Sequence, residues 1–288
     1  MLFRIKIIWL TACLTFGVNI FSLPVFAKDT ATPSQTEVRE MLKNICGQNN
    51  ILVQENMSGE DRLGCSAREA KKRISLSITN EDIFRVEGFI YGSFSKPGVK
   101  EALVDIEATS EPRSLFYGGS MLLRRSGQGW SFVWYKSGLR LNNCLKVPFK
   151  NNQSNVICKY EYYSANSQSE WLTLIDFENK THKNTTLLSV SNNLGNCKPP
   201  FRDIKITKFS GRDINSDGTT DIILNVRAGI SNAKKIPESQ CNEVNGKLPN
   251  SKMYQLVFLY NGKSFQPTPQ TAKQIKHFDY LMKTYITK

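Results

Sequence analysis

Residues 213–224 read DINSDGTTDIIL, a loop dense in oxygen-bearing side chains that leads straight into an apolar stretch. Acidic or amide side chains stand at positions 1, 3, 5 and 9 of the loop, and Gly218 at position 6 allows a sharp turn. Calcium is a hard cation that takes about six to eight oxygen ligands, so this pattern predicts one calcium site. The predicted ligands are Asp213, Asn215, Asp217, Thr219 through its carbonyl, and Asp221. The alternative is an Asx-rich turn, in which these side chains bond to the loop's own backbone.

The residues that follow the loop decide its class. An EF-hand needs a bidentate glutamate at position 12, where this chain has Leu224, and the stretch DIILNV predicts a strand instead of a helix. The loop resembles that of the FG-GAP and VCBS repeats, which form the blades of integrin-like propellers. The resemblance covers 202–226. It implies a blade of antiparallel strands, with a structural calcium ion that holds one turn and takes no part in catalysis.

A degenerate copy of the loop occurs earlier in the chain. Residues 92–104 read GSFSKPGVKEALV, and aligning Gly98 with Gly218 places Glu101 on Asp221. In both stretches a glycine turn is followed by an acid and then by an apolar strand. The earlier copy lacks the other predicted ligands, so we expect it to bind no metal.

The body of the chain predicts strands. Between about residues 74 and 260, stretches rich in Ile, Val, Phe, Tyr, Trp and Leu alternate with Gly, Pro, Asn and Ser clusters, which predicts roughly ten to twelve strands. These form three blade-like units, 88–138, 144–191 and 202–266, within a mainly β repeat domain at 88–266. We predict a propeller-like form or stacked antiparallel sheets. Because a ring needs roughly four to eight blades, the sheets form a partial ring or a sandwich, or the N-terminal region adds a fourth unit.

Both ends of this domain carry helix signals. Ser34 and Glu37 have the spacing of a capping box, and the apolar residues after them recur at helical intervals, which predicts a helix over 35–46. This helix belongs to an N-terminal helical and disulfide-bonded segment at 28–87. An apolar stripe in the last part of the chain predicts a C-terminal amphipathic helix within 267–288, packed on the body.

The first 27 residues have the three parts of a secretory signal. Arg4 and Lys6 are followed by an apolar run, and small Ala27 precedes the polar stretch KDTATPSQ. We therefore predict a signal peptide over 1–27, cleavage after Ala27, and a secreted or periplasmic protein. The alternatives are a membrane anchor and a lipoprotein with LTAC at 10–13 as its lipid-attachment box. After the signal, no stretch is apolar and long enough to cross a bilayer.

The cysteines predict disulfides. Six cysteines follow the signal, and an even number in an exported chain is typical of a disulfide framework. The sequence alone leaves their connectivity open, but chain order favours three local bonds: Cys46–Cys65, Cys144–Cys158 and Cys197–Cys241. A zinc site is the poorer alternative, because the chain has no CxxC motif and only two histidines.

The charge balance is strongly basic. Without Arg4 and Lys6 the chain has 36 basic and 25 acidic residues, a net charge of about +11. This balance favours an anionic partner such as a cell-envelope component or polymer. The sharpest basic clusters, at 71–73, 124–125 and 234–235, are short and scattered. We therefore expect no nucleic-acid binding.

One strand is rich in aromatic residues that suit either a core or a groove. In WSFVWY, strict alternation places Trp130, Phe132 and Trp134 on one face and Val133 and Tyr135 on the other. Such residues can line a sugar or peptide groove. In a buried strand they form core, which is the interpretation we favour.

The sequence offers no recognisable catalytic centre. There is no G-x-S-x-G, HExxH, P-loop or GxGxxG motif, and His182 and His277 lie in ordinary polar and helical settings. We therefore expect an exported, non-enzymatic, calcium-stabilised β-repeat protein that binds a partner. The alternatives are a secreted hydrolase with dispersed catalytic residues and an inhibitor of an envelope or host enzyme. A hydrolase built on histidine would bring His182 or His277 within hydrogen-bond reach of a serine, cysteine or acid.

Overall fold

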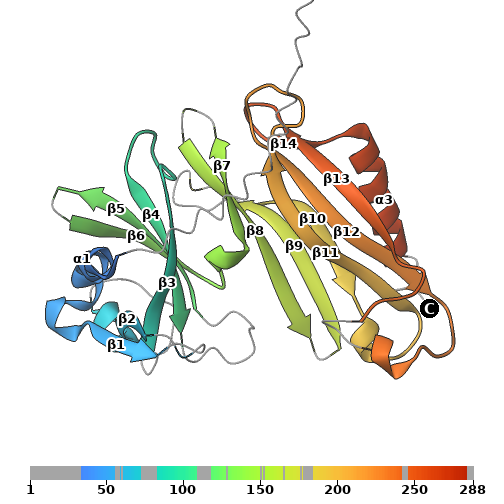
Figure 1. Cartoon of the computed structure of the whole chain (residues 1–288), viewed down its shortest axis with the longest axis horizontal. Helices are drawn as coiled ribbons and strands as arrows, with labels where there is room; N and C mark the ends of the chain where they lie inside the picture. Colours follow the sequence, from blue (N-terminus) through green and yellow to red (C-terminus); the bar gives the residue numbers. More distant parts are fainter. Residues whose placement is uncertain are drawn as a thin grey trace, which may run out of the picture.

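Figure 1 shows the computed structural model of the chain. The structure describes residues 34–55, 59, 61–72, 83–108, 118–127, 129–149, 151, 153–164, 166–175, 177, 184–241 and 246–283. The signal peptide predicted over 1–27, with cleavage after Ala27, lies outside these residues, and so does the end of the predicted C-terminal segment at 284–288. Among the described residues, no helix has the length and apolar character needed to cross a membrane.

The protein is mainly β, as predicted, and its strands form three antiparallel sheets in which each strand pairs only with its neighbours along the chain. The first sheet has six strands: β1 (Leu52–Glu55), β2 (Asp61–Ser66), β3 (Ile83–Gly92), β4 (Glu101–Ala108), β5 (Gly119–Ser126) and β6 (Gly129–Ser137). The second sheet has four: β7 (Cys144–Phe149), β8 (Gln153–Ser164), β9 (Ser167–Ile175) and β10 (Asn184–Asn192). The third sheet also has four: β11 (Phe201–Arg212), β12 (Asp221–Ser231), β13 (Lys252–Tyr260) and β14 (Phe265–Pro267).

The predicted units 88–138, 144–191 and 202–266 lie largely within one sheet each, and β1 and β2 extend the first sheet instead of forming a sheet of their own. The described strands form open sheets and no closed ring.

Three α-helices accompany the sheets: α1 (Gln35–Cys46), α2 (Ala67–Lys71) and α3 (Pro269–Lys283). α1 begins where the sequence predicts it, because Ser34 Oγ accepts the Glu37 N–H at 3.2 Å and satisfies a donor of the first helical turn. α3 follows the third sheet, and Thr271 Oγ1 near its start accepts the Val257 N–H of β13 at 2.7 Å. Short 3₁₀ turns occupy η1 (Gln48–Asn50), η2 (Leu141–Asn143), η5 (Leu194–Asn196) and η6 (Glu238–Gln240).

α1 covers the outer face of the first sheet, at one end of the molecule (Figure 1). Its apolar residues Met41, Leu42 and Ile45 are buried against side chains of that sheet, among them Trp130. The disulfide between Cys46 and Cys65 also ties the end of α1 to β2. Burial of this helix stripe removes apolar area from water on both partners, which is the main source of its stability.

The other faces of the sheets pack on one another. Ile90 and Leu103 of the first sheet share a core with Val156 of the second. The opposite face of the second sheet packs on the third, in a core that includes Ile157 and Leu224 and also takes in α3 through Phe278. The molecule is therefore a stack with α1 at one end and α3 at the other (Figure 1).

A β-bulge corrects one expectation about the aromatic strand. Leu122 pairs with Trp134 while Leu123 pairs with Phe132, so Val133 is an extra residue in β6. A bulge shifts the alternation of side chains beyond it. Trp134 therefore lies with Val133 in the core between the first two sheets, instead of on the face of Trp130 and Phe132.

The hairpins β3–β4 and β11–β12 have the same strand register. Glu101 pairs with Gly92, and Asp221 pairs with Arg212. Adding 120 to both residue numbers of a pair in β3–β4 gives the corresponding pair in β11–β12. The middle hairpin, β7–β8, is shorter and has a regular register.

These two hairpins also share their irregularities. The register shifts at Glu87 in β3 and at Thr207 in β11, which are corresponding positions. Both turns contain a glycine in the left-handed region, Gly98 with φ of 70° and Gly218 with φ of 81°. Because only glycine adopts this conformation without strain, the two turns follow a common backbone path at this point.

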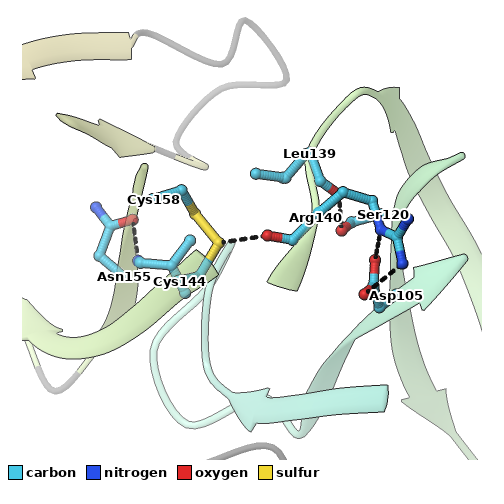
Figure 2. The surroundings of a disulfide bond; sticks show 8 residues. Asp105, Ser120, Leu139, Arg140, Cys144, Asn155 and Cys158 are labelled. Carbon is cyan, nitrogen blue, oxygen red and sulfur yellow. Dashed lines mark hydrogen bonds and ion pairs between the residues drawn. A yellow bond between two sulfur atoms is a disulfide. The ribbon is translucent and has the colours of Figure 1, made fainter. Parts of the chain in front are cut away.

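A buried ion pair lies at the junction of the first and second sheets (Figure 2). Asp105 of β4 accepts hydrogen bonds from Arg140 Nε at 2.9 Å and Nη2 at 3.3 Å. Burial raises the pKa of the Asp105 carboxyl, and the charge of Arg140 opposes that rise. Nearby, Ser120 Oγ donates to the Leu139 carbonyl at 2.5 Å. The connection from β6 to β7 is therefore fixed to the first sheet at two successive residues.

Candidate functional site

The loop 213–221 joins β11 to β12 at the surface, and its carboxylates accept hydrogen bonds from the loop itself. Asp213 accepts the Asp217 N–H at 3.2 Å and the Gly218 N–H at 2.9 Å. Asp217 accepts the Thr219 N–H at 2.8 Å and an amide N–H of Asn215 at 2.8 Å. These bonds, above all those from Thr219, hold the pKa of Asp217 below its ordinary value.

Asp221, the last predicted ligand, differs from the exposed residues of this loop in its burial. Its carboxylate is fully buried and accepts the N–H groups of Ile214, at 2.9 Å, and of Tyr260 in β13, also at 2.9 Å. Among the described residues, no three His, Cys, Asp or Glu side chains are gathered so that they could hold a metal ion. The loop's own N–H groups donate to the carboxylates of Asp213 and Asp217, as in an Asx-rich turn, and each carboxylate keeps a lone pair. The calcium site stays a prediction.

Glu101, the equivalent of Asp221 in the first hairpin, is also fully buried. It accepts the Ser95 N–H at 2.7 Å and the Ser95 hydroxyl, and it pairs with Arg124 Nε of β5 at 3.0 Å. In both hairpins the acid at the start of the second strand thus holds the preceding turn and contacts the third strand.

Four of the six predicted disulfide cysteines are bonded. Cys46 pairs with Cys65, and Cys144 pairs with Cys158 across β7 and β8, beside the Asp105–Arg140 ion pair (Figure 2). The third predicted bond is not formed: Cys197 and Cys241 are free thiols.

The histidines do not form a catalytic centre in the described part of the chain. His182 lies outside it. His277 lies on α3 beside the rings of Tyr254 and Phe278, with ring centroids 6.4 and 6.2 Å away. Within the described residues His277 makes no hydrogen bond to a serine, cysteine or acid.

A pocket of about 450 Å³ lies between α1 and the turn that joins β5 to β6. Its polar lining combines a carboxylate, an ammonium, an amide and two hydroxyls, beside one indole: Glu40, Lys43, Asn44, Ser126, Ser131 and Trp130. Proteins commonly bind small molecules in hollows of roughly 300–1,000 Å³ that combine an apolar wall with a few fixed polar groups. This pocket has the volume and the polar groups, whereas Trp130, its one aromatic lining residue, is buried beneath them.

Three contacts hold the walls of this pocket. Asn44 Nδ2 donates to the Trp130 carbonyl at 2.6 Å, and Arg125 Nη1 pairs with Glu40 Oε2 at 3.0 Å. The Arg125 guanidinium also lies 5.6 Å from the centre of the Trp130 ring, within the range of a cation–π contact. Gly129 keeps the approach close, because a Cβ there would lie 3.2 Å from Asn44 Nδ2.

The position of Trp130 agrees with the core interpretation and adds to it. The side chain is 1% exposed and belongs to the core beneath α1, while also lining the pocket. Sequence reasoning did not select Glu40, Lys43 and Asn44. Their spacing at i, i+3 and i+4 on the polar side of a predicted helix is a signal that could have grouped them.

A second pocket, of about 270 Å³, opens on the other side of α1, where it meets β2 and β3. Its wall includes Val38, Leu63 and Val86 together with Arg62 and Glu87. Arg62 Nε and Glu87 Oε2 are 3.6 Å apart. The charged groups are thus paired with each other, and we regard this pocket as the weaker candidate.

A cluster of ionisable side chains lies on the face of the second sheet that packs on the third sheet. Glu161 of β8 and Glu170 of β9 are directly opposite each other, and Lys159 makes an ion pair with Glu161. Tyr163 donates to Glu161 Oε2 at 2.8 Å, and Gln168 donates to Glu170 Oε1 at 3.0 Å. The cluster is thus cross-linked within the sheet.

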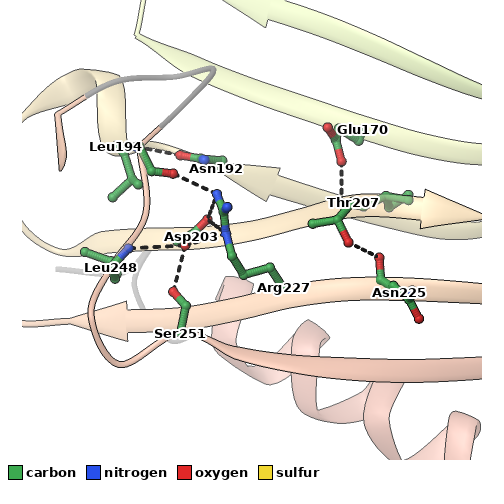
Figure 3. A network of polar contacts seen from close by, with 11 residues as sticks. Glu170, Asn192, Leu194, Asp203, Thr207, Asn225, Arg227, Leu248 and Ser251 are labelled. Atoms are coloured by element: carbon green, nitrogen blue, oxygen red, sulfur yellow. Dashed lines mark hydrogen bonds and ion pairs between the residues drawn. The ribbon is translucent and has the colours of Figure 1, made fainter. Parts of the chain in front are cut away.

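The two carboxyl groups of this cluster differ in pKa. Burial raises the pKa of Glu170, which is 1% exposed, and the charge of Lys159 only partly opposes it. Burial also raises the pKa of Glu161, but the hydrogen bond and charge of Lys159 outweigh it, so the net pKa is below the ordinary value. Glu170 Oε2 also accepts the Ile206 N–H at 2.5 Å, and this bond joins the second sheet to β11 of the third (Figure 3).

A further buried network fixes the connection between β12 and β13 (Figure 3). Asp203 is fully buried and accepts hydrogen bonds from Arg227 Nε at 3.0 Å and from Ser251 Oγ at 2.7 Å. It also accepts the Leu248 N–H at 3.3 Å. The network anchors residues 246–251 on the third sheet, and its groups are satisfied by one another.

Comparison with models of known protein families, with curated proteins and with solved structures gives no match.

Proposed function

We propose that the protein is an exported, non-enzymatic binding module whose ligand site is the pocket between α1 and the β5–β6 turn. The observation that carries this proposal is the pocket's combination of ligand-sized volume and convergent polar groups. The three sheets serve as its scaffold. We propose that they are blade-like units of the FG-GAP kind, stacked without ring closure, and the common register of β3–β4 and β11–β12 supports this relation.

The charges around the pocket favour an anionic ligand. Glu40 is already paired with Arg125 at 3.0 Å. Within the described residues no hydrogen bond or ion pair is made by the Lys43 ammonium, so it is the uncompensated charge at the pocket. The hydroxyls of Ser126 and Ser131 add groups that exchange hydrogen bonds with hydroxyl or carbonyl oxygens. These features support an anionic, hydroxyl-rich polymer of the cell envelope as the ligand class.

The test is calorimetric titration with three soluble probes of similar length: an oligogalacturonate, a glycerol-phosphate oligomer and a neutral cello-oligosaccharide. We expect binding of an anionic probe and at least a roughly tenfold loss of affinity in Lys43→Glu, equivalent to about 1.4 kcal/mol. Lys273→Glu makes the same charge change on exposed α3 and is the matched control. Equal loss in both variants, or binding of neither anionic probe, would refute the proposal.

One observation favours a second candidate function, the hydrolysis of a polymer. Opposite pKa shifts in neighbouring carboxyl groups are the arrangement that acid–base catalysis uses, and Glu161 and Glu170 show it. The burial of Glu170 and its bond to the Ile206 N–H count against this candidate, because a catalytic acid must reach its substrate. The release of new reducing ends from the same probes, abolished in Glu161→Gln, would support hydrolysis over binding.

A further inference from the structure

The two free cysteines lie together although 44 residues separate them. Cys197 follows η5 at the start of the third sheet, and Cys241 follows η6 in the connection between β12 and β13. Cys197 Sγ is 3.9 Å from the Cys241 carbonyl oxygen. A hydrogen bond between the two thiols, together with burial, raises the pKa of Cys241 to about 11.

The exposed thiol of Cys197 distinguishes this pair from the bonded cysteines. Cys46 and Cys65 are fully buried, Cys158 is 1% exposed and Cys144 is half-buried, so each disulfide has at least one sulfur shielded from solutes. Cys197 is exposed and Cys241 is half-buried. Thiol reactivity follows exposure as well as acidity, so chemistry with solutes concentrates on this pair.

The backbone around the pair is held by contacts that do not involve sulfur. Leu194 and Phe201, on the side of Cys197, share a buried cluster with Ile236 and Leu248, on the side of Cys241. The Asp203 network fixes the chain at Leu248 and Ser251. The two thiols are therefore kept as neighbours whether or not a bond joins them.

We propose that Cys197 and Cys241 form a reversible disulfide by exchange with a disulfide in the surroundings, and that this is the redox-responsive site of the described chain. The exposed Cys197 thiol loses its proton to solvent and attacks one sulfur of the external disulfide, which releases one thiol. The Cys241 sulfur then loses its proton and displaces the second thiol from Cys197. Two protein thiols are oxidised, one external disulfide is reduced to two thiols, and atoms and electrons balance.

The order of attack follows from the structure. A solute reaches the exposed Cys197 before the half-buried Cys241, so Cys197 is the first to react and Cys241 is the resolving sulfur. The new bond ties the β12–β13 connection to the η5 turn and constrains a loop that the third sheet otherwise holds by packing. The site lies in the third sheet and is independent of the pocket beside α1.

The experiment treats the purified protein with a graded series of oxidised glutathione, followed by alkylation and peptide mapping of every cysteine. We expect Cys197 and Cys241 to lose reactivity together and to appear as one cross-linked peptide pair. We also expect dithiothreitol to restore both at a concentration that leaves Cys46–Cys65 and Cys144–Cys158 intact. The midpoint of thermal unfolding is expected to rise with oxidation.

Separate glutathione adducts on the two thiols, or continued alkylation of both, would overturn the proposal. Two variants test the order of attack without depending on the new bond. Cys241→Ser is expected to accumulate a stable glutathione adduct on Cys197, because the resolving sulfur is gone. Cys197→Ser is expected to form adducts on Cys241 more slowly than Cys241→Ser forms them on Cys197, because the remaining sulfur is half-buried and not exposed. Equal rates in the two variants would contradict the assigned order.

Discussion

Glu101 and Asp221 hold the same position in two different sheets. Each begins the second strand of a hairpin, each is fully buried, and each accepts a backbone N–H from the turn before it, at 2.7 Å from Ser95 and 2.9 Å from Ile214. The pair of turns therefore closes by the same device, although only one of them carries the oxygen-rich loop. In both hairpins this shared arrangement fastens the turn to its sheet.

We first predict that Asp221→Asn lowers the free energy of unfolding by about 2 kcal/mol. The amide keeps the shape of the side chain but turns a donor toward one of two buried N–H groups, those of Ile214 and Tyr260. Urea unfolding measures the change. Asp213→Asn is the matched control, because water reaches its partners in the exposed loop, and we expect it to cost less than about 1 kcal/mol. Equal costs would show that the buried position is not what matters.

The second prediction concerns calcium. If the loop at 213–221 binds the ion, calcium at about 100 times its dissociation constant adds about 2.7 kcal/mol to the stability of the folded state. Each of the Asp213 and Asp217 carboxylates keeps a lone pair with which it can ligate the ion. Thermal unfolding with and without calcium measures the shift, and we expect Asp217→Ala to remove it. An unchanged midpoint in the unmodified protein would leave the loop as an Asx-rich turn.

The third prediction concerns the junction of the first two sheets. Arg140→Ala leaves the Asp105 carboxylate buried without its bidentate partner, and we expect a loss of about 3 kcal/mol in unfolding free energy. The double variant with Asp105→Ala removes both charges and is expected to cost less than the sum of the single changes, by about 1 to 3 kcal/mol. A double-mutant cycle in urea measures this coupling. Strict additivity would mean that the ion pair does not hold the junction.

The fourth prediction concerns pH. Burial raises the pKa of Glu170 in the folded state, so the folded protein binds this proton more tightly than the unfolded chain. The contribution of Glu170 to stability therefore falls as pH rises from the ordinary carboxyl range toward the folded-state pKa. Unfolding curves from about pH 4 to 8 are expected to show Glu170→Gln gaining stability relative to the unmodified protein as pH rises.

Glu161→Gln is the matched control for this experiment, because the carboxyl of Glu161 has a folded-state pKa below the ordinary value. A group of this kind contributes stability above its unfolded pKa and loses it as pH falls. The charged groups that face the cluster are Lys159 and Lys205. We therefore expect slopes of opposite sign in different windows: Glu170→Gln above the ordinary carboxyl pKa, and Glu161→Gln below it, so the curves are extended down to about pH 2. Parallel curves would contradict the assigned shifts.

The strand content and the two terminal helices could be predicted from the sequence, because they depend on local patterns. Alternating apolar residues between glycine turns indicated the antiparallel strands, and the Ser34–Glu37 spacing indicated the start of α1. The alignment of Gly98 with Gly218 came from the same kind of local signal, and it coincides with the common register of the two hairpins.

The remaining features depend on which strands meet. The bulge at Val133 arises from pairing with β5, so alternation within WSFVWY alone does not reveal that Trp134 changes face. The pocket joins Asn44 to Trp130 across 86 residues. The side chains of the loop at 213–221 suit both a calcium site and an Asx-rich turn. Sequence alone does not decide whether they ligate an ion or bond to the loop's own backbone. The separation of Cys197 and Cys241 from the bonded pairs likewise becomes visible only with burial.

Pairing only between neighbours along the chain has a consequence for how the molecule is assembled. Each sheet can be completed in the order in which its residues are made, without waiting for a distant strand. The apolar face of one sheet, in contrast, is covered only when the next sheet has been made. A chain that stops after Ser137 would leave Ile90, Leu103 and Leu122 without the second sheet that covers them. Every unfinished chain thus exposes an apolar sheet face that the next segment must reach before another molecule does.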